Sequence, residues 1–141
     1  MNSHPIQLSN LTVDEVYFKR LIWGDLEDYP SDFALTVSRS DYDAENKTIS
    51  VRIEMKVAPN FDEAGEPDRP FEMRILIAGH FEVDDTAFPV EHVHHWAETN
   101  APVILIPYMR EHAYSVSLRG GVSPVLFPLV QVPTFKIVAE H

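Results

Sequence analysis

The chain has 141 residues, of which 45% are hydrophobic and 23% are charged, and this balance predicts one globular domain spanning residues 1–141. Its formal net charge of −11 argues against a nucleic-acid partner, because phosphate binding needs clustered Lys and Arg, and it favours basic partners. The lack of cysteine excludes disulfides, thiolate catalysis and zinc sites built on cysteine.

No targeting or membrane-spanning segment is predicted. The first ten residues have neither the basic region nor the apolar run of a signal peptide. The longest apolar run, Ala101–Met109, contains two prolines and is far shorter than the ~20 residues that span a bilayer. We therefore expect a cytoplasmic protein without membrane insertion.

The first apolar segment, from Ile6 to Trp23, predicts an irregular strand. Its apolar residues change phase between 6 and 13, and a β-bulge near Ser9 and Asn10 would return them to one face. The consecutive apolar residues at 16–18 make both faces apolar, which predicts burial on both sides, as at a subunit interface.

Two later segments, 48–57 and 71–83, alternate between apolar and polar residues, and 33–37 does so more briefly. A period of two over such lengths is typical of strands with one buried and one wet face, which suits antiparallel pairing. The connection from 58 to 70 holds three prolines and Gly65, which predicts a mobile loop.

Helix follows the strands. The order Asn100-Ala101-Pro102 predicts a helix N-terminus, and the main helix is expected to run to Arg119. Gly120 fits the left-handed position after a helix, and Pro107 predicts a kink or a break. The tail from 121 to 138 is apolar and rich in proline, so we expect it to be extended.

The sequence contains few residue patterns that indicate a catalytic site. On a helix, Glu91, His95 and Glu98 would share a face and could ligate a metal, but a solvated helix face explains the same pattern. No serine lies in a Gly-x-Ser-x-Gly elbow, and no phosphate-binding loop is present. We therefore expect no catalytic residue, no metal and no cofactor, and a small-molecule or metal-binding protein is kept as an alternative.

The segment from Asn100 to Glu111 has the sequence NAPVILIPYMRE. It resembles the start of the long helix in the SecB family of protein-export chaperones, where a proline and an aliphatic run precede Pro-Tyr-x-Arg-Glu. That signature falls here on Pro107, Tyr108, Arg110 and Glu111. The similarity extends to 6–18, 79–83, 118–120, 127–129 and Pro133.

The resemblance implies an α+β fold, a four-stranded antiparallel Greek-key sheet with a long kinked helix on one face. It also implies a homotetramer, built as a dimer of dimers, that binds unfolded preproteins without ATP for post-translational export and passes them to the SecA motor. By analogy, the client-binding groove is lined by Phe18, Trp23, Tyr29, Leu105, Met109, Val125 and Phe127. For Leu105 and Met109, a place in the core is the alternative.

Charge separates two hypotheses about partners. SecB proteins dock on SecA partly through acids on the open sheet face, and Glu15 matches one such position. Lys19 and Arg74 stand where the family has acids, which disfavours a basic partner. The chain is thus either a general export chaperone or a SecB-like chaperone dedicated to one client, such as the antitoxin of a toxin–antitoxin pair.

Overall fold

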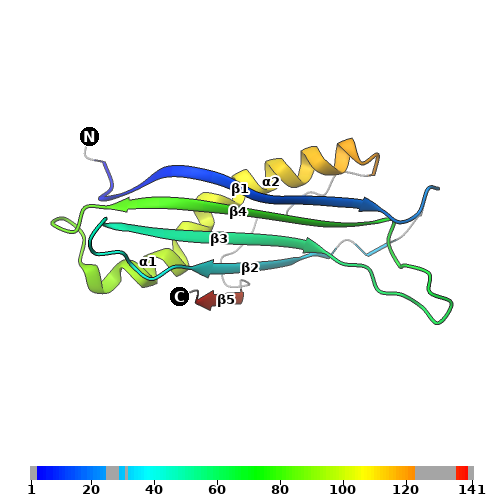
Figure 1. Ribbon diagram of the computed structural model, residues 1–141, viewed down its shortest axis with the longest axis horizontal. Coiled ribbons are helices and arrows are strands. Elements are labelled where there is room, and N and C mark those ends of the chain that lie inside the picture. The colour runs from blue at the N-terminus through cyan, green and yellow to red at the C-terminus, as the bar shows by residue number, and fades with distance from the viewer. Residues whose placement is uncertain (1–2, 25–28, 31, 123–135, 140–141) are drawn as a thin grey trace.

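The computed structural model describes residues 3–24, 29–30, 32–122 and 136–139. They form an α+β fold with both helices on one face of an elongated sheet (Figure 1). In chain order the elements are β1 (Ile6–Arg20), β2 (Ala34–Arg39), β3 (Thr48–Val57), β4 (Phe71–Val83), the 3-10 turn η1 (Val90–His92), α1 (Val93–Thr99), α2 (Ala101–Arg119) and β5 (Lys136–Ala139).

The sheet order is β1-β4-β3-β2-β5, and the first four strands pair antiparallel. This is the predicted Greek key. Strands β2, β3 and β4 are neighbours in sequence order, and β4 lies beside the first strand, β1. The short strand β5 was not foreseen as part of the sheet, and it pairs parallel to β2. It follows the last proline of the tail and lies at an edge, where a proline-rich segment can still contribute a strand.

The bulge predicted near Ser9 is confirmed, because the register against β4 shifts between Leu8 and Asn10. A second shift, between Val13 and Glu15, was not predicted. Residues paired across strands share a face of the sheet. The two shifts therefore bring every apolar residue of β1 except Tyr17 to the helix side. These residues are Ile6, Leu8, Leu11, Val13, Val16 and Phe18.

The core lies between this sheet face and the helices. Leu105 and Met109 are fully buried in it, so both occupy the core position considered as the alternative to the groove. A side chain on Gly79 would collide with Leu105, so glycine lets α2 approach β4 closely. The buried sheet residues include Ile49, Val51, Ile53, Met55, Met73, Ile75, Ile77 and Phe81.

The helix α2 begins as predicted, after Asn100 and with proline in its first turn. It continues through Pro107 as one long bent helix, so this proline bends the helix without ending it. The assignment of Gly120 to the left-handed position was wrong. Gly120 is helical at φ −75°, and Gly121 takes the left-handed turn at φ 72°.

The close contact between the end of α2 and β1 requires a residue without a side chain at position 120. A Cβ atom there would overlap the ring of Phe18, which packs against the last turn of α2. Arg20 fastens the same end of the helix, because its Nη1 donates to the Gly120 carbonyl at 2.9 Å. The C-terminus of α2 is thus tied to the end of β1.

We predict that Gly120→Ala lowers the free energy of unfolding by about 1–2 kcal/mol, because the new methyl group must displace the Phe18 ring. Chemical denaturation followed by circular dichroism would measure the change. Gly24→Ala is the matched control, since a Cβ atom at Gly24 meets no atom within 4 Å. Equal stability of the two variants would contradict the proposed contact.

Candidate functional site

Aromatic side chains gather where β1 ends and β4 begins. The rings of Phe18 and Phe71 stack with centroids 5.4 Å apart, and Tyr29 meets Phe71 edge-on at 6.5 Å. Phe71 is buried, whereas Phe18 and Tyr29 are half-buried and pack against the core. This cluster therefore continues the core to the surface.

Trp23 stands at the edge of this cluster and is 86% exposed. The guanidinium of Arg20 lies 5.5 Å from the centre of its ring, a cation–π distance. An indole held this far into solvent leaves a large apolar area available to another molecule. We call Phe18, Trp23, Tyr29 and Phe71 the aromatic end.

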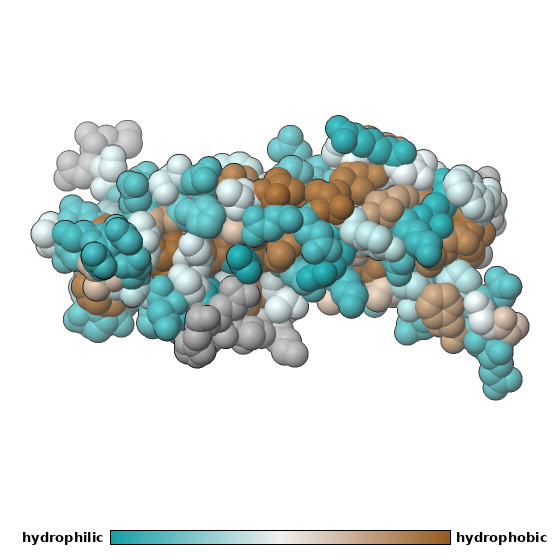
Figure 2. Space-filling view, in the orientation of Figure 1, coloured by the Kyte–Doolittle hydropathy of each residue, from teal (hydrophilic) through white to brown (hydrophobic). Residues whose placement is uncertain are grey.

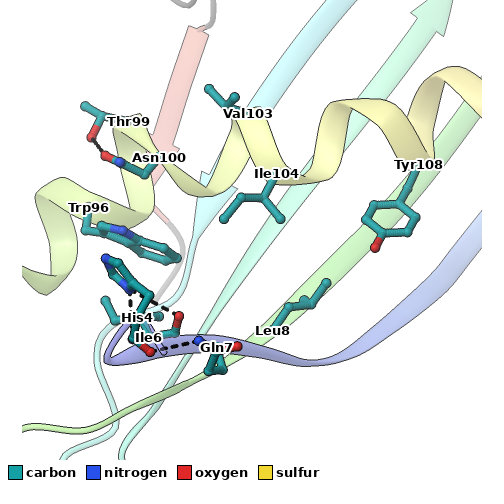
Figure 3. A pocket seen from close by; sticks show the side chains of 10 residues that line it. All are labelled: His4, Ile6, Gln7, Leu8, Trp96, Thr99, Asn100, Val103, Ile104 and Tyr108. Atoms are coloured by element: carbon teal, nitrogen blue, oxygen red, sulfur yellow. Dashed lines mark hydrogen bonds between the residues drawn. The ribbon is translucent and has the colours of Figure 1, made fainter. Parts of the chain in front are cut away.

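An open cleft of about 750 Å³ lies between β1 and the helices. Figure 3 shows Ile104 and Tyr108 pointing from α2 toward Leu8 on β1, with Trp96 and His4 closing one end. We call this space the β1 cleft. It is lined by His4, Ile6, Gln7, Leu8, Trp96, Thr99, Asn100, Val103, Ile104 and Tyr108.

The closed end of the β1 cleft is built from aromatic rings. Trp96 is almost fully buried and meets Phe81 edge-on at 5.1 Å, which anchors it to the core. The His4 ring stacks on Trp96 at 6.0 Å and accepts a hydrogen bond from the Ile6 amide at 3.0 Å. The cleft is therefore bounded by rings whose positions the core fixes.

The helices leave part of β1 uncovered. Val13 and Val16 lie on the helix side of the strand, opposite the buried Ile77 and Ile75, yet they are 45% and 49% exposed. β1 is also an edge strand of the sheet. An apolar row on an edge strand is a surface that natural proteins usually cover.

Ion pairs link the strands on the opposite face of the sheet. Figure 2 shows hydrophilic groups over much of the molecule, with a band of apolar groups along the upper middle of the view. Arg74 Nη2 lies 2.8 Å from Glu54 Oε2, and its Nη1 lies 3.1 Å from Glu15 Oε1. Hydrogen bonding and attraction from Glu54, and then from Glu15, raise the pKa of Arg74 above its usual value. Glu15 is thus paired with a cation from the neighbouring strand.

Tyr17 belongs to this opposite face, and its hydroxyl donates to Glu72 Oε1 at 2.7 Å. That hydrogen bond raises the pKa of the Tyr17 phenol. Tyr17 and Val16 are both exposed within this chain, so the predicted burial of 16–18 on both sides does not occur within the chain itself. A subunit interface at these residues stays a prediction.

The groove residues named from the sequence do not form one surface. The structure brings Phe18 and Tyr29 together on Phe71, and it places Trp23 against Arg20 at the end of the same strand, whereas Val125 and Phe127 lie outside the described residues. Sequence reasoning missed the β1 cleft as a site. Its signal was the pair Ile104 and Tyr108, apolar residues beside the buried stripe of the helix.

The signature residues of the helix lie away from the core. Pro107, Tyr108 and Glu111 are exposed. Arg110 is half-buried, and its Nε is buried without a hydrogen-bond partner in the described part of the chain. A buried donor of this kind is costly unless another group supplies an acceptor.

The histidines before α2 have structural neighbours. The Tyr42 amide donates to His94 Nε2 at 3.0 Å, and Arg39 Nε lies 2.9 Å from Glu98 Oε1. Across residues 3–24, 29–30, 32–122 and 136–139, no three His, Asp or Glu side chains are grouped to hold a metal ion. In the same residues, no helix is long and apolar enough to cross a membrane.

Comparison with known proteins gives similarity in structure only. No protein-family model matches the chain, and no curated protein matches its sequence. A protein of unknown function from Streptococcus agalactiae has 14% identity and a TM-score of 0.40 over 88% of this chain and 97% of its own.

The Mycobacterium tuberculosis Rv1957 SecB-like chaperone was solved in complex with a ChAD peptide from the Rv1956 HigA1 antitoxin. It matches with a TM-score of 0.69 and 14% identity, over 90% of this chain and 88% of its own. The overall architecture of that chaperone agrees with the sheet and helices of this chain. The chain therefore has the SecB-like fold.

Proposed function

We propose that this chain is a single SecB-like chaperone domain that holds unfolded polypeptides without ATP. The aromatic end, with Trp23 86% exposed, is the observation that carries the proposal. Burial of apolar surface has no preferred direction, so an exposed indole beside half-buried rings can bind many unrelated segments. Cytoplasmic clients are expected, because unfolded chains expose such segments before they fold or cross a membrane.

We assign the β1 cleft and the exposed row at Val13 and Val16 to contact between copies of this chain. An edge strand with apolar side chains is self-complementary, since a two-fold axis brings the same strip of a second copy onto it. The proposed assembly is a homotetramer, a dimer of dimers.

The range of clients remains a choice between two candidates. A general export chaperone would deliver preproteins to SecA through acids on the outer sheet face. Here Arg74 is paired with Glu15 and Glu54, which weakens the attraction of that face for a basic partner. The SecB-like neighbour binds an antitoxin peptide. The first observation weakens the case for delivery to SecA, and the second makes an antitoxin peptide the client to test for the alternative, a chaperone dedicated to one client.

The proposed holding activity is tested by diluting a chemically unfolded model protein into buffer and recording light scattering without ATP. We expect the chain to suppress aggregation in a dose-dependent way, close to one tetramer per client. A chaperone with one client would instead fail in this assay and bind a defined antitoxin peptide. Failure with both would contradict the proposed function.

Trp23→Asp should weaken suppression about tenfold, because a charge replaces an exposed aromatic contact. The free energy of unfolding should change by less than about 0.5 kcal/mol, since the side chain is largely in solvent. Val90→Asp is the control, because Val90 is also an exposed apolar residue but lies at the start of η1. Equal suppression by the two variants would remove the aromatic end from the client site.

The double variant Val13→Asp/Val16→Asp should reduce the molar mass of the assembly, because two carboxylates would have to be buried between copies. Size-exclusion chromatography with multi-angle light scattering measures this mass. Tyr108→Asp tests the β1 cleft in the same experiment. If Tyr108→Asp weakens client binding at unchanged mass, the cleft belongs to the client and not to the subunit contact.

The pairing of Arg74 gives a test of the two candidates. If general export is the function, purified SecA should bind the wild-type chain. If the outer face has lost this role, Arg74→Glu should improve SecA binding, since it removes the cation that compensates Glu15 and adds an acid. Exposed ion pairs contribute only about 0–1 kcal/mol each, so the variant should remain folded, which circular dichroism would check.

A further inference from the structure

The connection between β3 and β4, residues 58–70, projects from one end of the sheet (Figure 1). Several hydrogen bonds join its two arms. The Asp68 amide donates to the Asn60 carbonyl at 2.8 Å, and the Asp62 amide donates to the Glu66 carbonyl at 3.0 Å. Asp62 Oδ1 also accepts from two loop amides at 2.9 Å, and Gly65 turns the chain at φ 79°. The loop therefore has a defined shape of its own.

An aromatic ring stands on this loop. Phe61 pairs by backbone with Pro67, and its side chain is 61% exposed. Figure 2 shows an apolar group among hydrophilic ones on the projecting loop. The loop backbone thus holds a large apolar side chain in solvent, where its burial by a partner would be favourable.

Four carboxylates lie close to Phe61 in the sequence. Within seven residues the loop carries Asp62, Glu63, Glu66 and Asp68. The hydrogen bond from the Asn60 amide is the main reason why the pKa of Asp68 is lowered, so this carboxylate stays charged. Among the described residues, the carboxylates of Glu63 and Glu66 have no ion-pair or hydrogen-bond partner.

Arg69, the only basic residue in 58–70, does not neutralise the exposed surface of the loop. The Arg69 side chain is 4% exposed and is turned into the stem, where Nη2 lies 3.0 Å from Asp32 Oδ1 and Nε lies 3.5 Å from Asp68 Oδ1. Its Nη1 donates to the Asp32 carbonyl at 2.9 Å. The exposed part of the loop therefore combines an apolar ring with negative charge.

The loop joins the aromatic end directly. The amides of Leu21 and Ile22, just before Trp23, donate to the Pro70 carbonyl at 2.7 and 3.2 Å. The next residue after Pro70 is Phe71, which stacks on Phe18. The base of the loop and the aromatic end therefore adjoin each other at Pro70 and Phe71.

We propose that residues 58–70 form a second client contact, which binds extended polypeptide segments that carry an apolar side chain flanked by Lys or Arg. Phe61 buries the apolar side chain, and Glu63 and Glu66 attract the flanking cations. The inference rests on the proposed function and deepens it, since it gives the chaperone a preference for basic apolar segments.

The test uses two fluorescent peptides with the same unstructured apolar centre, one flanked by Lys and one by Glu. Their binding to the full chain is measured by anisotropy. The wild-type chain should bind the Lys-flanked peptide more tightly. Phe61→Ser should weaken that binding about fivefold or more, whereas Val90→Ser, which removes another exposed apolar side chain, should not.

The charge preference needs its own control, because the whole chain is acidic. Glu63→Lys/Glu66→Lys should reduce the ratio of the two affinities at least about fivefold. Glu45→Lys/Glu82→Lys makes the same change in net charge at exposed positions outside the loop and should reduce it less.

The outcomes separate this inference from the proposed function. If the loop variants behave like their controls while Trp23→Asp weakens both peptides, the loop is not a client contact and the chaperone activity stands. The same holds if the chain suppresses aggregation but binds neither peptide. Failure to bind the peptides, to suppress aggregation and to bind an antitoxin peptide would overturn both.

Discussion

The two bulges of β1 are the constraint on which the other features depend. A strand with strict alternation would turn half of its apolar residues to the wrong face, because side chains change face at every residue. Register shifts beside Ser9 and Asp14 instead keep the apolar residues from Ile6 to Phe18 on the helix side. The core, the β1 cleft and the exposed row at Val13 and Val16 all follow from this alignment.

The helix α2 then decides which of these apolar residues are buried. Its inward side, with Leu105, Met109 and Ala113, fills the core against β3 and β4. Its C-terminus is held at the end of β1 by Phe18 and Arg20. Apolar surface beside this path remains accessible in the chain, so the same packing that stabilises the fold leaves the surfaces available for binding.

Charge is distributed unevenly between the outer sheet face and the 58–70 loop. On the outer sheet face, Arg74 lies close to carboxylates from both neighbouring strands, and Arg52 on β3 lies 3.6 Å from Asp14 on β1. In the 58–70 loop, the only arginine is buried, whereas Asp62, Glu63 and Glu66 are exposed. The proposed preference for basic segments therefore rests on local pairing and not on the total charge of −11.

The sequence by itself determined the strand phases, the bulge near Ser9, the start of α2 at Asn100 and, through the Pro-Tyr-x-Arg-Glu signature, the SecB-like architecture. These features are encoded by residues near one another in the chain. Only the tertiary structure decided the partners of Arg74 and the close contact of Phe18 with Gly120 at the C-terminus of α2. It also decided the β1 cleft, because its walls, Leu8 and Ile104, are brought together by the packing of distant elements and not by any local pattern.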